Sequence, residues 1–398
     1  MLCSTNKALG SATEVAGGVG SQRGKFALKV RGFRMKLCFL ADGRHVNTIS
    51  WVQYLANELE QEIHLIGFEA VQAAHSRIKT YPLGVGSRSP LRYVAYIPAV
   101  RKLVHEIQPH ILIGYRITSY GFMAALSGFH PLVLAAQGQN IAYNASRIKA
   151  CFARYAIRRA DLIHSWGPHM TTKLEELRAD PAKILTLPRG IDTRMFKPVQ
   201  TAEDPERPGR GFTIISTRGL NPDYNFEQIL AALTKFKQSR EGFTYTVAGD
   251  GSFRAALEQR VRAMGLSESV KFLGRVRHEE VAKELQAADV YVSTVVTDGV
   301  SASLLEAMAC GTFPVVTDNA ANRLWIRHGV NGYLVRYGDP DDLAQKIRAA
   351  GRDAALRRRA AATNWVLVQQ RACIHTNMRQ FVAMWARLCG QHVQYGEA

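Results

Sequence analysis

The chain has 398 residues, of which 47% are hydrophobic and 21% are charged. These values are typical of a globular protein, and the length predicts two domains that each bury a core of their own. The six cysteines are scattered without a Cys-x-x-Cys pair, which argues against a zinc site and predicts reduced thiols in a cytoplasmic protein. A net charge of +18 suits phosphorylated ligands or anionic surfaces, and no helix-turn-helix, zinc-finger or RNA-stacking pattern accompanies it, so nucleic acid is not an expected partner.

The first 34 residues differ from the rest of the chain. Residues 1–34 are rich in small and basic residues and lack the apolar core of a secretory signal, so we expect a disordered extension or a start upstream of the true one at Met35. No segment is typical of a membrane span. The most apolar region, Ile111 to Ala136, contains Arg116 and His130.

Residues 35–192 alternate strand-like and helix-like patterns, with helical spacing for example at Trp51, Leu55 and Leu59. Continuously apolar runs predict strands at Lys36–Ala41, Ile63–Gly67, Ile111–Ile113, Leu132–Ala135, Leu162–His164 and Ile184–Leu187. Strands that are apolar throughout and alternate with helices predict a parallel sheet with both faces covered.

Residues 193–210 break this rhythm with several prolines and predict a linker. A second α/β series follows in residues 211–364, with strands predicted at Phe212–Thr217, Thr244–Ala248, Val270–Leu273, Val290–Ser293 and Phe313–Val316. Two such domains would face each other across a cleft at the carboxyl ends of their strands. Residues 365–398 contain helical periodicity from Trp365 to Leu388, and we expect this helix to return to the first domain.

The strongest chemical signal runs from Thr297 to Val316. It combines a strand end, a turn of small residues and a helix that begins near Ser301. Small residues there let an anionic ligand approach free backbone N–H groups, and the helix dipole favours a phosphate at that end. Asp298 precedes the turn and Glu306 lies within the helix, so the two carboxylates can hold different parts of one extended ligand.

This segment resembles the donor-site motif of GT-B glycosyltransferases of family 4, Glu-x7-Glu followed by Ala-Met-Ala-x-Gly-x-Pro-Val-Val. The resemblance implies that Asp298, which stands in place of the first Glu, contacts hydroxyls of the transferred sugar. It also implies that Glu306 holds the nucleotide ribose while amides of the turn bind the diphosphate. The donor-binding residues expected here are Gly299, Val300, Ser301, Ser303, Leu304 and Glu306.

A second match, Ser216–Asn225, is similar to the family segment Gly-Arg-Leu-x-Pro-x-Lys-Gly, whose Arg and Lys grip the diphosphate. Arg218 matches the Arg, and a guanidinium fork suits bidentate phosphate contact. Tyr224 and Asn225 fall where the Lys is expected. Either another basic residue, such as Arg189 or Arg194, supplies the charge, or the donor binds differently.

Two weaker matches lie in the same half. Gly249 and Gly251 resemble the Gly-x-Gly turn of the family, although many α/β loops use glycine for geometry alone. The loop from Leu273 to His278 resembles the one beside the nucleotide base, which implies backbone contacts at Arg275 and Val276.

In the first half, Ala41–Thr48 resembles the first loop of the family, so Gly43 and His45 are expected to face the donor phosphates and the acceptor. His45 would steer an acceptor hydroxyl or bind phosphate, and a helix-capping role is an equal contender. Gln137–Asn140 stands where relatives commonly show Trp-Gly-Ser-Asp, which weakens any argument for a general base there. Pro188–Pro198 is similar to the hinge segment of the family.

The resemblance extends from Met35 to Leu388 and implies the GT-B fold, two Rossmann-like domains with an interdomain cleft. It implies a retaining glycosyltransferase that uses a nucleoside diphosphate sugar and needs no metal or other cofactor. Arg218, Asp298 and His45 are the residues expected to act at the reacting groups, and the donor's own phosphate would deprotonate the incoming hydroxyl. Two alternatives remain: a non-catalytic relative that serves as a partner or regulatory subunit, and a nucleotide-sugar epimerase of the same architecture.

Basic residues concentrate in the first half beside aromatic residues such as Tyr93, Phe152 and Tyr155. This pattern predicts either a face that lies on an anionic membrane or an ordinary solvated basic face. We therefore expect a carbohydrate or lipid-linked acceptor, such as an intermediate of glycolipid or surface-polysaccharide assembly. The expected location is cytoplasmic, with peripheral contact to the inner face of the cytoplasmic membrane.

Overall fold

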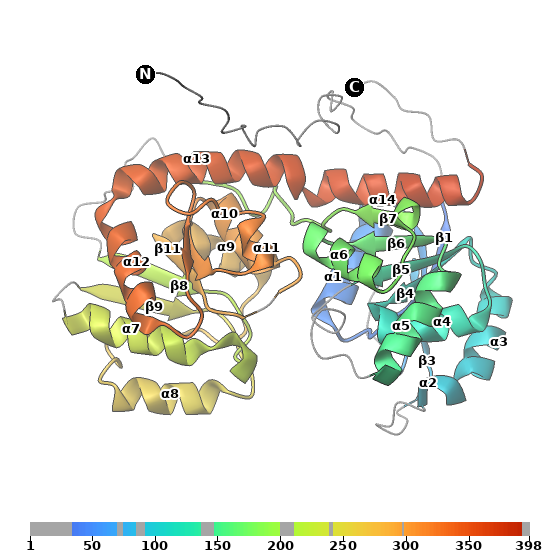
Figure 1. Ribbon diagram of the computed structural model, residues 1–398, viewed down its shortest axis with the longest axis horizontal. Helices are drawn as coiled ribbons and strands as arrows, with labels where there is room; N and C mark the ends of the chain where they lie inside the picture. Colours follow the sequence, from blue (N-terminus) through green and yellow to red (C-terminus); the bar gives the residue numbers. More distant parts are fainter. Residues whose placement is uncertain are drawn as a thin grey trace, which may run out of the picture.

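The computed structural model of the chain describes residues 34–69, 75–84, 92–136, 147–199, 211–238, 242–296 and 298–391. The expected N-terminal extension, most of the expected linker and the segment Gln137–Asn140 therefore lie outside the described residues. Within this part, the predicted fold class is confirmed, because two α/β domains each contain one parallel sheet (Figure 1).

The first domain is built on a parallel sheet with the strand order β3-β2-β1-β4-β5-β6-β7. Its strands are β1 Lys36–Leu40, β2 Glu62–Gly67, β3 Ile78–Pro82, β4 Ile111–Tyr115, β5 Leu132–Ala136, β6 Leu162–Ser165 and β7 Ile184–Thr186. Its helices are α1 Val46–Asn57, α2 Arg92–Ala95, α3 Ile97–Ile107, α4 Gly121–Ser127, α5 Arg147–Arg159 and α6 Pro168–Glu176. A π-helical turn, Arg116–Tyr120, joins β4 to α4. Every residue of β4 and β5 is buried, which explains the unbroken apolar runs in the sequence.

The second domain repeats this plan with the strand order β10-β9-β8-β11-β12-β13. Its strands are β8 Phe212–Ser216, β9 Phe243–Val247, β10 Val270–Phe272, β11 Val290–Ser293, β12 Phe313–Thr317 and β13 Tyr333–Val335. Its helices are α7 Phe226–Gln238, α8 Arg254–Ala263, α9 His278–Ala287, α10 Ala302–Cys310, α11 Ala320–Arg323, α12 Pro340–Arg352 and α13 Ala354–Arg371. Successive strand residues enter different cores: Ile214 packs in one hydrophobic cluster and Ile215 in another. The sheet is therefore covered on both faces.

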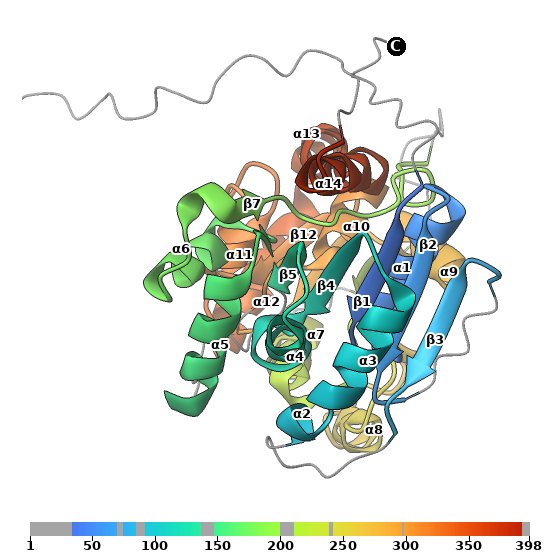
Figure 2. The same cartoon turned by 90° about the vertical axis from the view of Figure 1, so that its right-hand side faces the viewer.

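The C-terminal helix α14, Ile374–Leu388, belongs to the core of the first domain. Its Phe381 packs on His164 with ring centroids 4.2 Å apart, and Met378 Sδ accepts a hydrogen bond from Trp51 Nε1 at 3.0 Å. Figures 1 and 2 show α14 along one end of that domain, opposite the end that carries α2, and following α13 end to end. The return to the first domain begins at Ile374 rather than at Trp365, because α13 is still packed on the second domain.

The chain crosses between the domains twice, and the two crossings are paired. Ile191 N donates to Ala372 O and Ile374 N donates to Ile191 O, both at 2.9 Å. Gly190 has φ +86°, and a Cβ there would lie 2.5 Å from Ala372 O, so only glycine fits this approach. No helix in the described part of the chain is long and apolar enough to cross a bilayer.

Candidate functional site

A cleft of about 540 Å³ lies between the two domains and is lined by residues of both. Its walls come from loops that follow parallel strands: His45 after β1, Arg116 after β4, Arg218 after β8 and Asp298 after β11. Ligands in doubly wound folds bind at this end of the sheet, because the strand ends leave loops and helix N-termini facing one crevice. The cleft is therefore the candidate site.

The N-terminus of α10 forms the second-domain wall. Ser301 caps the helix, and its Oγ accepts from Leu304 N at 3.2 Å. Asp298 Oδ1 accepts from Gly299 N at 2.9 Å. Two of the expected phosphate-binding amides are thus already engaged within the turn. Ser303 is among the residues that line the cleft, together with Gly299 and Val300, whereas Ser301 and Leu304 are not.

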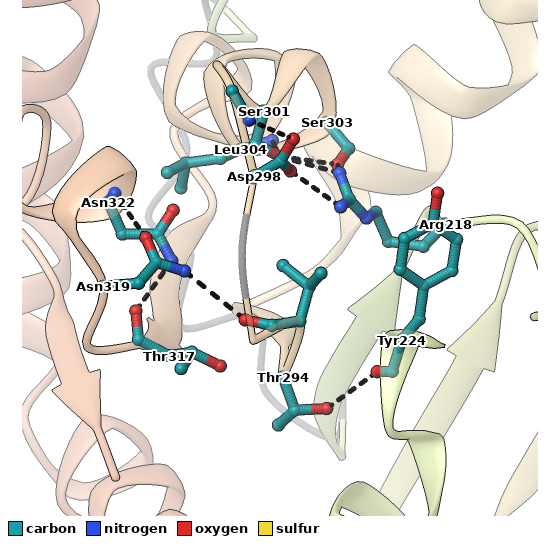
Figure 3. A network of polar contacts seen from close by, with 12 residues as sticks. Arg218, Tyr224, Thr294, Asp298, Ser301, Ser303, Leu304, Thr317, Asn319 and Asn322 are labelled. Atoms are coloured by element: carbon teal, nitrogen blue, oxygen red, sulfur yellow. Dashed lines mark hydrogen bonds and ion pairs between the residues drawn. The ribbon is translucent and has the colours of Figure 1, made fainter. Parts of the chain in front are cut away.

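Arg218 is held by side chains of this turn (Figure 3). Its Nη2 donates to Asp298 Oδ2 at 2.7 Å, and its Nη1 donates to the hydroxyls of Ser301 and Ser303 at 3.0 and 3.3 Å. The guanidinium carbon lies 4.6 Å from the centre of the Tyr224 ring. Burial disfavours the charged guanidinium, but the Asp298 carboxylate and two neighbouring tyrosines together outweigh this effect, so the pKa of Arg218 is raised above its usual value.

Tyr224 stands in the region where the motif has its lysine, and hydrogen bonds to its backbone hold it in place. Thr294 Oγ1 donates to Tyr224 O at 3.2 Å and to Asn225 O at 2.9 Å. Thr294 begins the loop that follows β11. The next residue of this loop, Val295, accepts a hydrogen bond through its carbonyl from Asn319 Nδ2 at 3.4 Å, and Asn319 lies just after β12. These bonds fix the loop between β11 and α10 relative to Arg218 (Figure 3).

Glu306 lines the cleft one helical turn beyond Ala302. Burial raises the pKa of its carboxyl, and the positive charges of His278, Arg189 and Arg218 act in the opposite direction. No hydrogen bond to this carboxylate is found among the described residues. The side chain is thus available to a ligand.

Of the two residues considered as substitutes for the missing lysine, only Arg189 lines the cleft. Its guanidinium donates to Asn47 O at 3.2 Å and to Ser50 Oγ. Burial lowers the pKa of Arg189. Arg194 lies elsewhere and pairs with Glu58 at 3.0 Å on an exposed surface.

His45 caps α1, since its Nδ1 accepts from Asn47 N at 3.2 Å, and it also lines the cleft. Both roles proposed from the sequence are therefore compatible with its position. Burial lowers the pKa of His45, and Arg116 and Arg189 lower it further against the opposing effect of Asp42. The imidazole is neutral at neutral pH, with Nδ1 as the acceptor and Nε2–H left to donate.

The remaining expected contacts are not among the residues that line the cleft, namely Gly43, Gly249, Gly251, Arg275 and Val276. The Gly-x-Gly turn instead supports the Arg218 loop. A Cβ on Gly249 would lie 2.1 Å from Arg218 O, and one on Gly251 would lie 2.2 Å from Leu220 O. The glycines allow their loop to pack directly against the backbone of the Arg218 loop, and this contact positions Arg218.

Arg116 also lines the cleft, although no motif in the sequence marks it as a site residue. Its signal was its place directly after a continuously buried strand, Ile111–Tyr115, where a charged residue enters a cleft.

Two family models match the chain, each to one domain. Residues 200–364 match the family described as "Glycosyl transferases group 1", and residues 36–166 match "Glycosyl transferase 4-like". The fold also matches solved structures at 100% of their length. Anabaena HepE in complex with UDP aligns over 89% of this chain at 18% identity with a TM-score of 0.74, and a sucrose-phosphate synthase from Thermosynechococcus elongatus over 90% at 17% identity with a TM-score of 0.75. These matches support a glycosyltransferase of the GT-B type.

Curated relatives are similar over parts of the chain. A putative glycosyltransferase, EpsD of Bacillus subtilis, is 29% identical over 40% of this chain and 42% of its own length. A D-inositol 3-phosphate glycosyltransferase of Geodermatophilus obscurus is 31% identical over 47% of this chain and 45% of its own length. A GDP-mannose-dependent phosphatidylinositol monomannoside mannosyltransferase of Mycobacterium tuberculosis is 23% identical over 62% of this chain and 68% of its own length. The chain thus spans less than half of the first two relatives.

Proposed function

We propose that this chain transfers a sugar, with retention of configuration, from a nucleoside diphosphate sugar to a carbohydrate or lipid-linked acceptor. The observation that carries the proposal is the arrangement around α10: Arg218 and the helix N-terminus line the cleft, and Glu306, one helical turn beyond Ala302, lines it as well. This spacing suits a ligand with a diphosphate at one point and a ribose at another. The donor would therefore lie along the second domain.

The same groups would act on the departing diphosphate. Negative charge develops on this leaving group in the transition state, and fixed dipoles and cations stabilise it without reorganising. Arg218 and the first-turn amides of Ala302 and Ser303 are such groups. Because the counter-charge comes from arginine and a helix dipole, we propose a reaction without a metal ion. The donor's own phosphate would deprotonate the incoming hydroxyl on the same face.

The acceptor side belongs to the first domain. Six relatives carry names with an inositol phosphate or phosphatidylinositol group. On α5, which has no acidic residue in its first turn and ends on Arg158 and Arg159, Ile148 is 63% exposed and Tyr155 is 41% exposed. Apolar side chains among basic ones suit an anionic membrane surface. We propose a peripheral contact there, with a glycolipid or surface-polysaccharide intermediate as the acceptor.

Sedimentation with anionic vesicles at low salt tests this contact. The full chain should bind and should lose binding when Ile148 and Tyr155 are both changed to Ser. Equal sedimentation of the variant, or none of the wild type, rules the contact out.

Donor binding is tested by thermal shift against UDP-, GDP- and ADP-sugars, with and without EDTA, on the wild type and Glu306→Ala. At a ligand concentration of 100 times Kd, stabilisation should reach about 2.7 kcal/mol. One nucleotide should stabilise the wild type in both buffers and leave Glu306→Ala unshifted. No shift with any donor contradicts the proposal.

A second function is favoured by two observations. Asp298 already neutralises Arg218, and Tyr224 stands in the lysine region, so a non-catalytic subunit that binds a partner remains the alternative. Slow hydrolysis of a bound donor by the wild type, lost in Arg218→Ala, would exclude it. Donor binding without hydrolysis or transfer to any glycolipid would favour it.

A further inference from the structure

Three arginines in the described part of the chain line the cleft. Among them, only Arg116 has a side chain without a hydrogen bond or ion pair to any residue that the structure describes. It directly follows β4, in the first domain, beside His45. The residue is half-buried, and its guanidinium has five N–H donors that no described residue accepts. Such a group is available to an anion from outside.

The other cleft arginines are already engaged. Arg218 forms an ion pair with Asp298 at 2.7 Å, and it also donates hydrogen bonds to serine hydroxyls. Arg189 donates to Asn47 O and Ser50 Oγ, and the charge of Glu306 acts on its guanidinium. The positive charge that a phosphate would meet in this cleft therefore lies mainly on the first-domain side.

The backbone conformation at Arg116 also indicates a functional role. Its φ is +66°, a left-handed conformation that costs a non-glycine residue energy, and it opens a π-helical turn. Strained residues and π-helical turns are found preferentially at functional sites, where the surrounding fold holds a side chain in place.

We propose that Arg116 binds a phosphate group of a ligand in the cleft and takes over the role of the lysine that is missing beside Tyr224. The inference rests on the proposed function and deepens it, because it assigns the counter-charge to the acceptor domain. The neutral His45, whose Nε2–H is free to donate, lies on the same wall and would add a second contact. The phosphate would come from the donor diphosphate or from a phosphorylated acceptor.

The test compares Arg116→Gln, which removes the charge, with Arg116→Lys, which keeps it. Arg178 offers a matched control: it is an exposed arginine with φ +67°, outside the cleft, so Arg178→Gln removes the same charge from the same backbone conformation. Circular dichroism and thermal unfolding confirm that each variant is folded. Calorimetry then measures binding of uridine, UDP, guanosine and GDP, and binding of glycerol phosphate both with and without a nucleoside diphosphate present.

We expect Arg116→Gln to weaken one phosphate ligand about tenfold, Arg116→Lys to weaken it about threefold, and Arg178→Gln to leave it unchanged. Weaker UDP or GDP with unchanged nucleoside identifies the donor diphosphate as the source. Unchanged diphosphate with weaker glycerol phosphate identifies the acceptor. Equal affinities of the wild type and Arg116→Gln in every arm overturn the inference.

The two proposals fail differently. If the wild type binds no nucleoside diphosphate, the donor-binding function is wrong, and Arg116 is then judged on glycerol phosphate alone. If the diphosphate binds and Arg116→Gln changes nothing, the proposed function stands and the role of Arg116 is wrong.

Discussion

Arg218 Nη2 and Asp298 Oδ2 are 2.7 Å apart although the two residues are 80 positions apart in the sequence. They meet because β8 and β11, the strands that precede them, are hydrogen-bonded neighbours in the sheet. Their side chains are 12% and 21% exposed, so the pair is shielded from solvent. The carboxylate that the motif assigns to the sugar thus also fixes the arginine assigned to the diphosphate.

Replacing Asp298 with Ala should lower the free energy of unfolding by about 3 kcal/mol, because it leaves a shielded guanidinium unpaired. Asp298→Asn keeps an acceptor oxygen and should cost less. Urea denaturation measures both. An equal and small effect of the two variants would show that the ion pair contributes nothing to stability.

The same variants separate two roles for Asp298 in ligand binding. If Asp298 acts by positioning Arg218, Asp298→Ala should change the affinities for UDP and for UDP-glucose by the same factor, since both contain the diphosphate. A loss confined to UDP-glucose would instead indicate direct contact with the sugar. GDP and GDP-mannose serve in the same way if the chain prefers guanine.

Tyr224→Lys tests the substitution at the expected lysine. Removing the ring 4.6 Å from Arg218 should cost about 1 kcal/mol of stability. The added charge should raise the affinity for a nucleoside diphosphate several-fold at low salt, and the gain should shrink as salt is added. Tyr224→Phe keeps the ring and should change neither quantity. Weaker nucleotide binding by Tyr224→Lys would contradict this prediction.

Gly249→Ala should disturb the site indirectly, through the backbone of Arg218. The new Cβ would lie 2.1 Å from Arg218 O, so the Arg218 loop must move, at a cost of about 2 kcal/mol and with loss of nucleotide affinity. Gly242→Ala is the control, because nothing lies within 4 Å of its Cβ. Calorimetry and urea denaturation should show both effects for Gly249→Ala only. Unchanged nucleotide affinity in this variant would mean that Gly249 does not support the binding site.

The central strands and one edge strand of each sheet, β7 and β10, were predictable from the sequence, whereas the opposite edge strand of each sheet was not. Buried parallel strands such as β4 and β5 are apolar throughout, and this pattern marks them directly. The missed strands are Ile78–Pro82 and Tyr333–Val335, which lie at the edges, are short and are only partly buried. Ile78–Pro82 contains the polar Lys79 and Thr80 and ends on a proline, and Tyr333–Val335 has only three residues, so periodicity does not identify either strand.

At the site, motif resemblance identified residues but not their contacts. It singled out Arg218, Asp298 and Glu306, which do line one cleft. It could not reveal that Asp298 pairs with Arg218, because this contact depends on strand order rather than on spacing along the chain. Gly249 was assigned to the ligand because a Gly-x-Gly turn looks the same whether it faces a phosphate or a backbone.

Glu306→Gln should affect stability and binding in opposite directions. Burial raises the pKa of Glu306, so as pH rises from the ordinary carboxyl range to this raised pKa the unfolded chain loses a proton that the native chain keeps, and stability falls. The amide removes this charge and should stabilise the chain at pH 7.5 by about 1 kcal/mol. It should weaken nucleotide binding at least tenfold, because the ribose hydroxyls lose a charged acceptor. Destabilisation at pH 7.5 would contradict the first half, and unchanged affinity the second.

Acid should destabilise the first domain through His164. This residue is fully buried against Phe381 and Trp385, and burial lowers its pKa to about 3. Between roughly pH 6.5 and 3 the unfolded chain therefore binds a proton that the native chain does not, and stability falls by about 1.4 kcal/mol per pH unit from this group. His164→Phe should remove that component, so the difference in unfolding free energy between pH 6.5 and pH 5 should shrink by about 2 kcal/mol. The exposed His105 supplies the control, since His105→Gln should keep the wild-type difference. An unchanged pH dependence in His164→Phe would mean that the imidazole is already protonated in the native core.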